Sequence, residues 1–155
     1  MRKILKFLIL LLIPLSVGAV SGFFTVSDVK SWYDLLNKPS WNPPRYLFGP
    51  VWTTLYLLMG YSCFRISEAR RSKTRTLALQ LFGLQLFVNF WWSILFFHFH
   101  LIGTALVEII ILWILILAMI IQFRKVDPTA AWLNIPYLLW VSFASVLTAT
   151  IYYLN

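Results

Sequence analysis

The sequence predicts an all-α integral membrane protein, a five-transmembrane-helix bundle, and three observations indicate this fold class. Of the 155 residues, 61% are hydrophobic and only 12% are charged, whereas an average soluble domain has about 45–50% apolar and about 25% charged residues. The apolar residues form five runs that are long enough to cross a bilayer core of about 30 Å as helices. Only short polar breaks separate the runs, which predicts a single domain over residues 1–155.

The helices are expected at residues 4–24, 46–66, 77–97, 102–123 and 130–154. The first run follows a basic N-terminus, and the small residues 17–19 also resemble the cleavage site of a secretory signal. A retained helix is favoured because the apolar run continues to Phe24, and because Gly18 and Gly22 offer a surface for close helix packing. In the last run, Pro136 predicts a kink or a local opening, since it removes a backbone hydrogen bond.

Lysine and arginine residues lie between the apolar runs, so they indicate topology rather than a nucleic-acid partner. With five spans, the N-terminus shares a side with Arg2, Lys3, Lys6, Arg65, Arg70, Arg71, Lys73, Arg75, Arg124 and Lys125. The opposite side has only Lys30, Lys38 and Arg45. By the positive-inside rule, this asymmetry places the N-terminus in the cytoplasm and the C-terminus outside.

The first connection, residues 25–45, carries Trp32, Tyr33 and Trp41 on a backbone that three prolines stiffen. It is therefore expected to be a structured lid or an interfacial loop rather than a slack tether. The same rings would also suit an aromatic belt at the level of the lipid headgroups. From the residues alone, both interpretations of these rings stay open.

Polar side chains inside the spans are costly in a bilayer and are expected to face the interior of the bundle. Gln85, Asn89, Trp92 and Phe96 recur at i, i+4, i+7 and i+11, so they share one helical face. Asn89 is the best candidate for a polar contact to a ligand. A hydrogen bond between helices is the simpler explanation of an asparagine at this place.

In two other runs, large rings share a helical face with small residues, and they would either line a slot or simply pack. These faces comprise Trp52, Tyr56, Met59 and Gly60 in the second run, and Pro136 or Tyr137, Trp140, Ala144 and Thr148 in the fifth.

Residues that carry chemistry are few. The single cysteine, Cys63, cannot form an intrachain disulfide. Glu108, the only acid within a span, is expected to reach the interface or to stay neutral rather than to relay protons. His98 and His100, at i and i+2, do not share a helical face, so no metal site is expected. No nucleophile arrangement or phosphate loop is present, which disfavours a hydrolase or a nucleotide-driven pump. The remaining acids lie in connections and are expected to be solvated: Asp28, Asp34, Glu68 and Asp127.

Four segments together form a distinctive pattern: WYDLLNKPSWNPP at residues 32–44, FGPVWTTLY at 48–56, NFWWS at 89–93 and PYLLW at 136–140. With these segments the chain resembles, over nearly its whole length, the TspO/MBR family, the tryptophan-rich sensory proteins that include the mitochondrial translocator protein. The resemblance implies a five-helix bundle in a bacterial cell membrane, commonly a homodimer, whose pocket is closed by the first connection.

The resemblance also implies the ligand. Family members bind protoporphyrin IX, other tetrapyrroles and similar hydrophobic small molecules. The resemblance therefore implies a porphyrin as the ligand, and it implies no obligatory cofactor. By matching positions, the ligand-binding residues would be Trp32, Tyr33, Pro43, Trp52, Tyr56, Asn89, Trp92, Trp140 and Ala144. The basic residues Lys30, Lys38 and Arg45 would form a rim that attracts propionate groups. The C-terminus lacks the basic residue of the sterol motif found in animal members.

The function expected from these features is that of a membrane receptor or regulator that binds a tetrapyrrole under an aromatic lid. Two alternatives stay open. One is a transporter of porphyrin or lipid, although no inverted repeat or coupling-ion site is visible. The other is a light-dependent porphyrin-degrading enzyme, in which Trp52 and Trp140 would be the catalytic residues.

Overall fold

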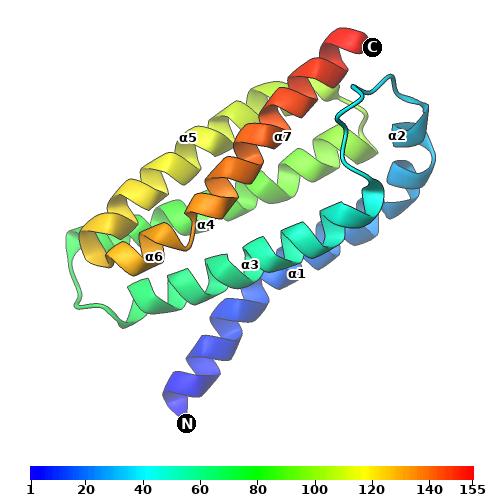
Figure 1. The fold of residues 1–155 in the computed structure, drawn as a ribbon. Coiled ribbons are helices and arrows are strands. Elements are labelled where there is room, and N and C mark those ends of the chain that lie inside the picture. Colours follow the sequence, from blue (N-terminus) through cyan, green and yellow to red (C-terminus); the bar gives the residue numbers. More distant parts are fainter.

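The computed structural model describes residues 1–155, which form helices and no β-strand (Figure 1). Two short helices and a π-helix join the long ones: α2 (Trp32–Leu35), α6 (Pro128–Trp132) and η1 (Ile94–His98). The long helices are α1 (Arg2–Lys30), α3 (Arg45–Glu68), α4 (Lys73–Ser93), α5 (Ile102–Val126) and α7 (Ile135–Leu154).

Four helical segments are long and apolar enough to cross a membrane: Arg2–Lys30, Lys73–His98, Ile102–Val126 and Pro128–Leu154. They identify an integral membrane protein and confirm the predicted all-α class. The 24-residue helix α3 is not among these segments, because its apolar residues alternate with tryptophan, tyrosine, threonine, serine and glycine. By composition the structure thus supplies four spans, one fewer than the sequence predicts.

The first connection is shorter than expected. Helix α1 continues to Lys30, because no proline or glycine interrupts residues 25–30, and α2 follows at once. The segment from Leu36 to Pro44 then follows, and it is extended at both ends. It contains a turn at Ser40 and Trp41, where the Asn42 N–H donates to the Pro39 carbonyl oxygen at 3.0 Å. The three prolines of this segment keep it out of a helix. The predicted loop 25–45 is therefore a helical extension, a short helix and a stiff strap.

The predicted disturbance of the last run lies before Pro136 rather than at it. The chain leaves the helix at Leu133 and Asn134, so α6 and α7 are separate helices. Pro136 occupies the first turn of α7, where its missing N–H has no helical partner to lose. The buried Asn134 side chain secures the break, since its Nδ2 donates to the Ala130 carbonyl at 2.9 Å and to Ser62 Oγ at 2.8 Å.

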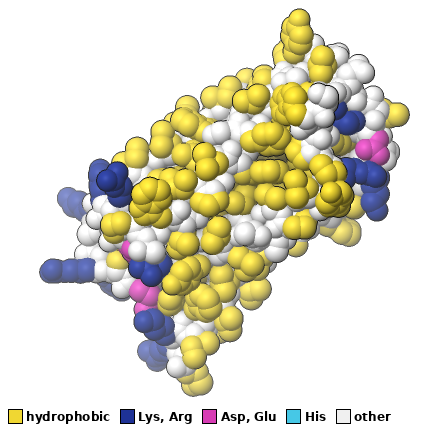
Figure 2. All heavy atoms as spheres, viewed as in Figure 1, with side chains coloured by type: hydrophobic (Ala, Val, Ile, Leu, Met, Phe, Trp, Pro, Cys, Tyr) yellow, Lys and Arg dark blue, Asp and Glu magenta, His cyan; other side chains and the backbone are white.

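Charged side chains fasten the ends of the helices, and Figure 2 shows lysine and arginine gathered at the two ends of a largely hydrophobic surface. Arg65 Nε donates to Asp127 at 2.7 Å, and Asp127 also caps α6 by accepting from the Thr129 N–H. The Arg65 guanidinium holds the pKa of Asp127 below its usual value. Lys6 pairs with Glu68 at 2.7 Å. None of the four acids in the connections is buried, as expected, and each of them also pairs with a basic or histidine side chain.

Candidate ligand-binding site

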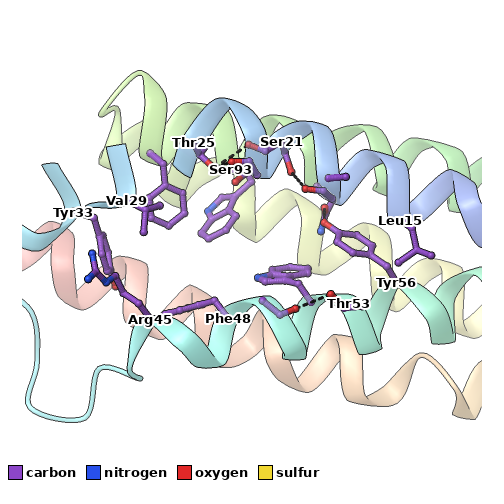
Figure 3. Close-up of a pocket in the computed structure, with 18 residues that line it drawn as sticks. Leu15, Ser21, Thr25, Val29, Tyr33, Arg45, Phe48, Thr53, Tyr56 and Ser93 are labelled. Carbon is purple, nitrogen blue, oxygen red and sulfur yellow. Dashed lines mark hydrogen bonds between the residues drawn. The ribbon is translucent and has the colours of Figure 1, made fainter. Parts of the chain in front are cut away.

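A cavity of about 500 Å³ lies between α1, α3 and the junction of α4 with η1, and it is open on the side where the exposed residues Gly22, Gly49 and Thr53 line it. This volume is typical of small-molecule sites, which span about 300–1,000 Å³. In Figure 3, α1 and α3 form facing walls, with Tyr56 toward one end and Tyr33 and Arg45 at the other.

The shape of the cavity follows from one close approach of α1 to α3. A Cβ atom on Gly60 would lie 2.7 Å from Leu11 Cα and 2.8 Å from the Leu10 carbonyl oxygen, so the two backbones nearly touch there. Farther along, a Cβ on Gly22 in α1 or on Gly49 in α3 would meet nothing within 4 Å, and both residues line the cavity. The helices therefore pack tightly near Gly60 and leave open space between them toward the lid.

A chain of buried hydrogen bonds closes the deep side of the cavity. The Tyr56 hydroxyl donates to Asn89 Oδ1 at 2.7 Å, and Asn89 Nδ2 donates to the Tyr137 hydroxyl at 3.0 Å. That hydroxyl donates in turn to Gln85 Oε1 at 2.7 Å. The chain joins α3, α4 and α7 through side chains that are almost fully buried. Asn89 thus bonds helices together and also lines the cavity, with one amide hydrogen left over.

Aromatic rings supply most of the apolar wall. Trp52 stacks on Tyr56, with ring centroids 5.5 Å apart and planes 27° from parallel. Trp92 stacks on Phe96 at 5.7 Å and 24°. The Trp92 side chain is buried, and its Nε1 has no hydrogen-bond partner. A buried N–H without a partner costs about 1–3 kcal/mol, so Trp92 is held in place by the packing of its ring rather than by a hydrogen bond.

The lid is anchored by Tyr33, which is 3% exposed and whose hydroxyl donates to Asn42 Oδ1 at 2.7 Å. Burial raises the pKa of Tyr33 to about 12, so the hydroxyl stays protonated and keeps this bond. Lys38 Nζ donates to the carbonyl oxygens of Tyr33 at 2.7 Å and of Leu36 at 3.0 Å. The ammonium of Lys38 therefore holds the end of α2 together and does not belong to a free cationic rim.

The predicted ligand-binding residues separate into three groups. Five of them line the cavity: Tyr33, Trp52, Tyr56, Asn89 and Trp92. Two lie beside an adjoining cavity of about 20 Å³, which Tyr33, Trp52 and Trp92 also line: Trp140 and Ala144. Two line neither cavity: Trp32 and Pro43.

Trp32 has a different neighbour from the one predicted. Its ring stacks on His100 with centroids 4.1 Å apart and planes 12° from parallel. His100 Nε2 and His98 Nδ1 both approach the Asp28 carboxylate, at 3.4 Å and 3.2 Å. Although i and i+2 do not share a helical face, the two rings reach the same carboxylate because η1 ends at His98 and His100 adopts a φ of 58° outside any helix. The cluster joins the end of α1 to the turn after η1.

One wall of the cavity was missed by sequence reasoning. Gly18, Ser21, Gly22 and Thr25 of α1 all line it, and the two hydroxyls donate to carbonyl oxygens of their own helix. A signal for this wall existed, since the Gly18 and Gly22 pair indicated close packing and Ser21 and Thr25 are polar residues inside a span. Gly18 does pack closely, because a Cβ there would lie 2.3 Å from the Tyr56 ring.

Comparison with known proteins agrees with this architecture. The family model described as TspO/MBR family matches residues 10–154. Tryptophan-rich protein TspO of Chlorobaculum tepidum is 39% identical over 155 residues, which cover 99% of this chain and 98% of that protein. Tryptophan-rich protein TspO of Archaeoglobus fulgidus is 39% identical over 156 residues and 99% of each chain. The Translocator protein of Bos taurus is 36% identical over 138 residues, 88% of this chain and 82% of its own. The chain therefore belongs to the TspO/MBR family of membrane proteins.

Proposed function

We propose that this protein is a membrane receptor that sequesters a flat hydrophobic ligand, a tetrapyrrole such as protoporphyrin IX, in the cavity between α1 and α3. The observation that carries the proposal is a cavity of about 500 Å³ that is walled by Trp52, Tyr56 and Trp92 and bounded at one end by Tyr33 and Arg45. Aromatic faces attract flat rings in offset stacking. No obligatory cofactor is needed for this role, which is binding alone.

The few polar atoms of the cavity suit an extended ring system with acceptor atoms. Asn89, which lines the cavity, keeps one amide hydrogen after donating to Tyr137, so it is a donor. The Tyr56 hydroxyl uses its hydrogen on Asn89, so it offers the ligand only an acceptor. A ligand that fills the apolar space and meets one or two of these atoms gains orientation as well as affinity.

The glycines that face open space allow a sharp test. Purified protein is titrated with protoporphyrin IX in the dark, and quenching of tryptophan fluorescence is followed for wild type, Gly22→Leu and Gly49→Leu. Both glycines line the cavity and a Cβ at either would meet nothing within 4 Å, so the leucine side chains are expected to take up cavity space and to weaken binding. Gly83→Leu is the matched control, because a Cβ there also meets nothing and Gly83 lines neither cavity. Equal affinity in all four proteins would refute the cavity as the binding site.

The membrane arrangement is part of the proposal. Helix α3 has 24 residues and packs beside α1 (Figure 1), and at 1.5 Å per residue it would reach about 36 Å, more than a bilayer core. We therefore propose α3 as the fifth span, with the N-terminus in the cytoplasm of a bacterial cell and the lid outside. Labelling of single cysteines by an impermeant reagent, in a Cys63→Ala background, tests this topology. The homodimer that the family implies is tested by cross-linking in membranes.

Light-dependent degradation of the porphyrin is a second candidate, favoured by the position of Trp52. Its ring lines both cavities and stacks on Tyr56, so it would contact a bound ring directly. Trp140 lines only the smaller cavity, where it packs against Phe48 and Phe143. Under illumination in air, Trp52→Phe is expected to slow product formation more than Trp140→Phe. If both variants form the same amount of degradation product as wild type, the enzymatic role is refuted and the binding role stands. Uptake of porphyrin into sealed vesicles that contain the protein would instead indicate transport.

A further inference from the structure

We propose that the lid end of the cavity is a subsite for a carboxylate of the ligand, in which Arg45 exchanges its ion pair with Asp34 for one with the bound anion. The inference rests on the proposed function, because it concerns the same cavity. It goes further in assigning the acidic edge of the ligand to Arg45, and in naming Asp34 of the lid as the competitor for this cation.

The charges of the cavity wall point to an anion. Among the lining residues, Arg45 is the only one with a formal charge, and no aspartate or glutamate faces the cavity. The other two cations of the expected rim are placed differently. Lys38 donates its ammonium hydrogens to backbone carbonyls, and Lys30 is not part of the lining. A ligand in the cavity therefore meets one positive charge, at the end opposite the buried hydrogen-bond chain (Figure 3).

Arg45 already holds a carboxylate. Its Nη1 donates to Asp34 Oδ2 at 2.7 Å, which ties the first residue of α3 to α2 of the lid. The two side chains are 48% and 44% exposed, so water screens their attraction and the pair contributes little net stability. A guanidinium has five N–H donors in a planar fork that matches a carboxylate. A ligand carboxylate can thus take over Arg45 at small cost, or share it with Asp34.

The exchange has a consequence for the lid. While Asp34 holds Arg45, α2 is tied to α3 at the lid end of the cavity. When a ligand anion takes the guanidinium, this tie is released, while the Tyr33 and Lys38 hydrogen bonds continue to hold α2 in shape. The acid therefore selects for ligands whose own carboxylate is positioned well enough to displace it. An uncharged ring of the same size leaves the tie intact and gains nothing from Arg45.

The test compares two ligands in four full-length proteins. Protoporphyrin IX carries two carboxylates, and its dimethyl ester has the same ring without charge. Affinities in the dark are measured for wild type, Arg45→Gln, Asp34→Asn and Lys30→Gln. Arg45→Gln is expected to lower the affinity for the diacid by roughly three- to tenfold, because a charge-assisted hydrogen bond is lost at a site that water partly screens. The affinity for the ester should not change. Removing Asp34 is expected to tighten the diacid by a few-fold, again without effect on the ester. Lys30→Gln, with the same loss of charge, should match wild type.

The outcomes distinguish failure of the proposed function from failure of the carboxylate subsite. If neither porphyrin binds wild type saturably, the proposed function fails, and this subsite with it. If both bind and the ratio of diacid to ester affinity is the same in all four proteins, the subsite is refuted while the receptor role stands. Loss of the preference in Lys30→Gln as large as in Arg45→Gln would also refute it. The gain expected for Asp34→Asn guards against misfolding, because a damaged protein would not bind the diacid more tightly.

Discussion

Two identical substitutions are expected to change the stability of this protein in opposite directions. Gly→Ala inside an exposed helix stabilises by up to about 1 kcal/mol, because alanine has the higher helix propensity. At Gly83, in the membrane-spanning helix α4, the added methyl group would meet nothing within 4 Å, so no steric cost opposes this gain. At Gly60 the same methyl group would lie 2.7 Å from Leu11 Cα and 2.8 Å from the Leu10 carbonyl oxygen.

The obstacle at Gly60 is backbone, so no side chain can rotate away from it. The contact would have to lengthen from 2.7 Å to the 3.4 Å at which ordinary contacts begin, which requires α1 to move away from α3. Overpacking of this kind costs about 1–3 kcal/mol, more than the propensity gain. Gly60→Ala should therefore lower the free energy of unfolding by up to about 2 kcal/mol. Because the displaced helix forms a wall of the cavity, porphyrin affinity should change as well.

Thermal unfolding of the detergent-solubilised variants, followed by tryptophan fluorescence, measures both effects side by side. Gly60→Ala should unfold below wild type and Gly83→Ala at or above it. A Gly60→Ala protein as stable as Gly83→Ala would show that the two helices do not meet as closely as described, and the account of how the cavity forms would then be wrong.

Three further predictions concern the hydrogen bonds. Tyr137→Phe leaves Asn89 and Gln85 each without one buried partner, so the free energy of unfolding should fall by about 1–3 kcal/mol, and calorimetry that finds no change would contradict the chain. Lys38→Met removes the donor to the carbonyls at the end of α2, so bound porphyrin should dissociate faster in stopped-flow measurements while Lys30→Met behaves as wild type. Arg65 lowers the pKa of Asp127 in the folded protein. The ion pair therefore stabilises the fold at pH values above the pKa of an aspartate in the unfolded chain, about 3.9. This stabilisation is lost as the pH falls through the lower pKa of Asp127 in the folded protein. Asp127→Asn should remove that part of the acid dependence of unfolding.

Local features of the sequence predicted the helices well. The stripe at Gln85, Asn89, Trp92 and Phe96 was expected to face the interior, and all four side chains are buried. Helix periodicity depends only on neighbours along the chain, so it can be seen without the fold. The helix boundaries differ from the predicted ones, since α1 continues to Lys30 and the last predicted helix is divided at Leu133 and Asn134.

Side-chain contacts between helices that are distant in the sequence could not be predicted from the sequence alone. The four acids of the connections stay in contact with solvent as expected, but the sequence did not predict their partners: Asp34 meets Arg45, and Asp28 meets His98. Such contacts depend on how helices separated by many residues cross. The same holds for the polar atoms of Asn89, whose partners come from α3 and α7.

By itself the sequence determined that this is a membrane protein of helices with a marked asymmetry of basic residues, and the tryptophan-rich segments determined its family. The length of an apolar run, its charge and its motifs are properties of short stretches of chain, so they can be recognised in the sequence without the tertiary structure. Only the tertiary structure decided which rings enclose the cavity, that α1 supplies one of its walls, and that Arg45 alone brings charge to it. These depend on the close approach at Gly60, where the absence of a side chain lets α1 and α3 meet and then leave a space between them.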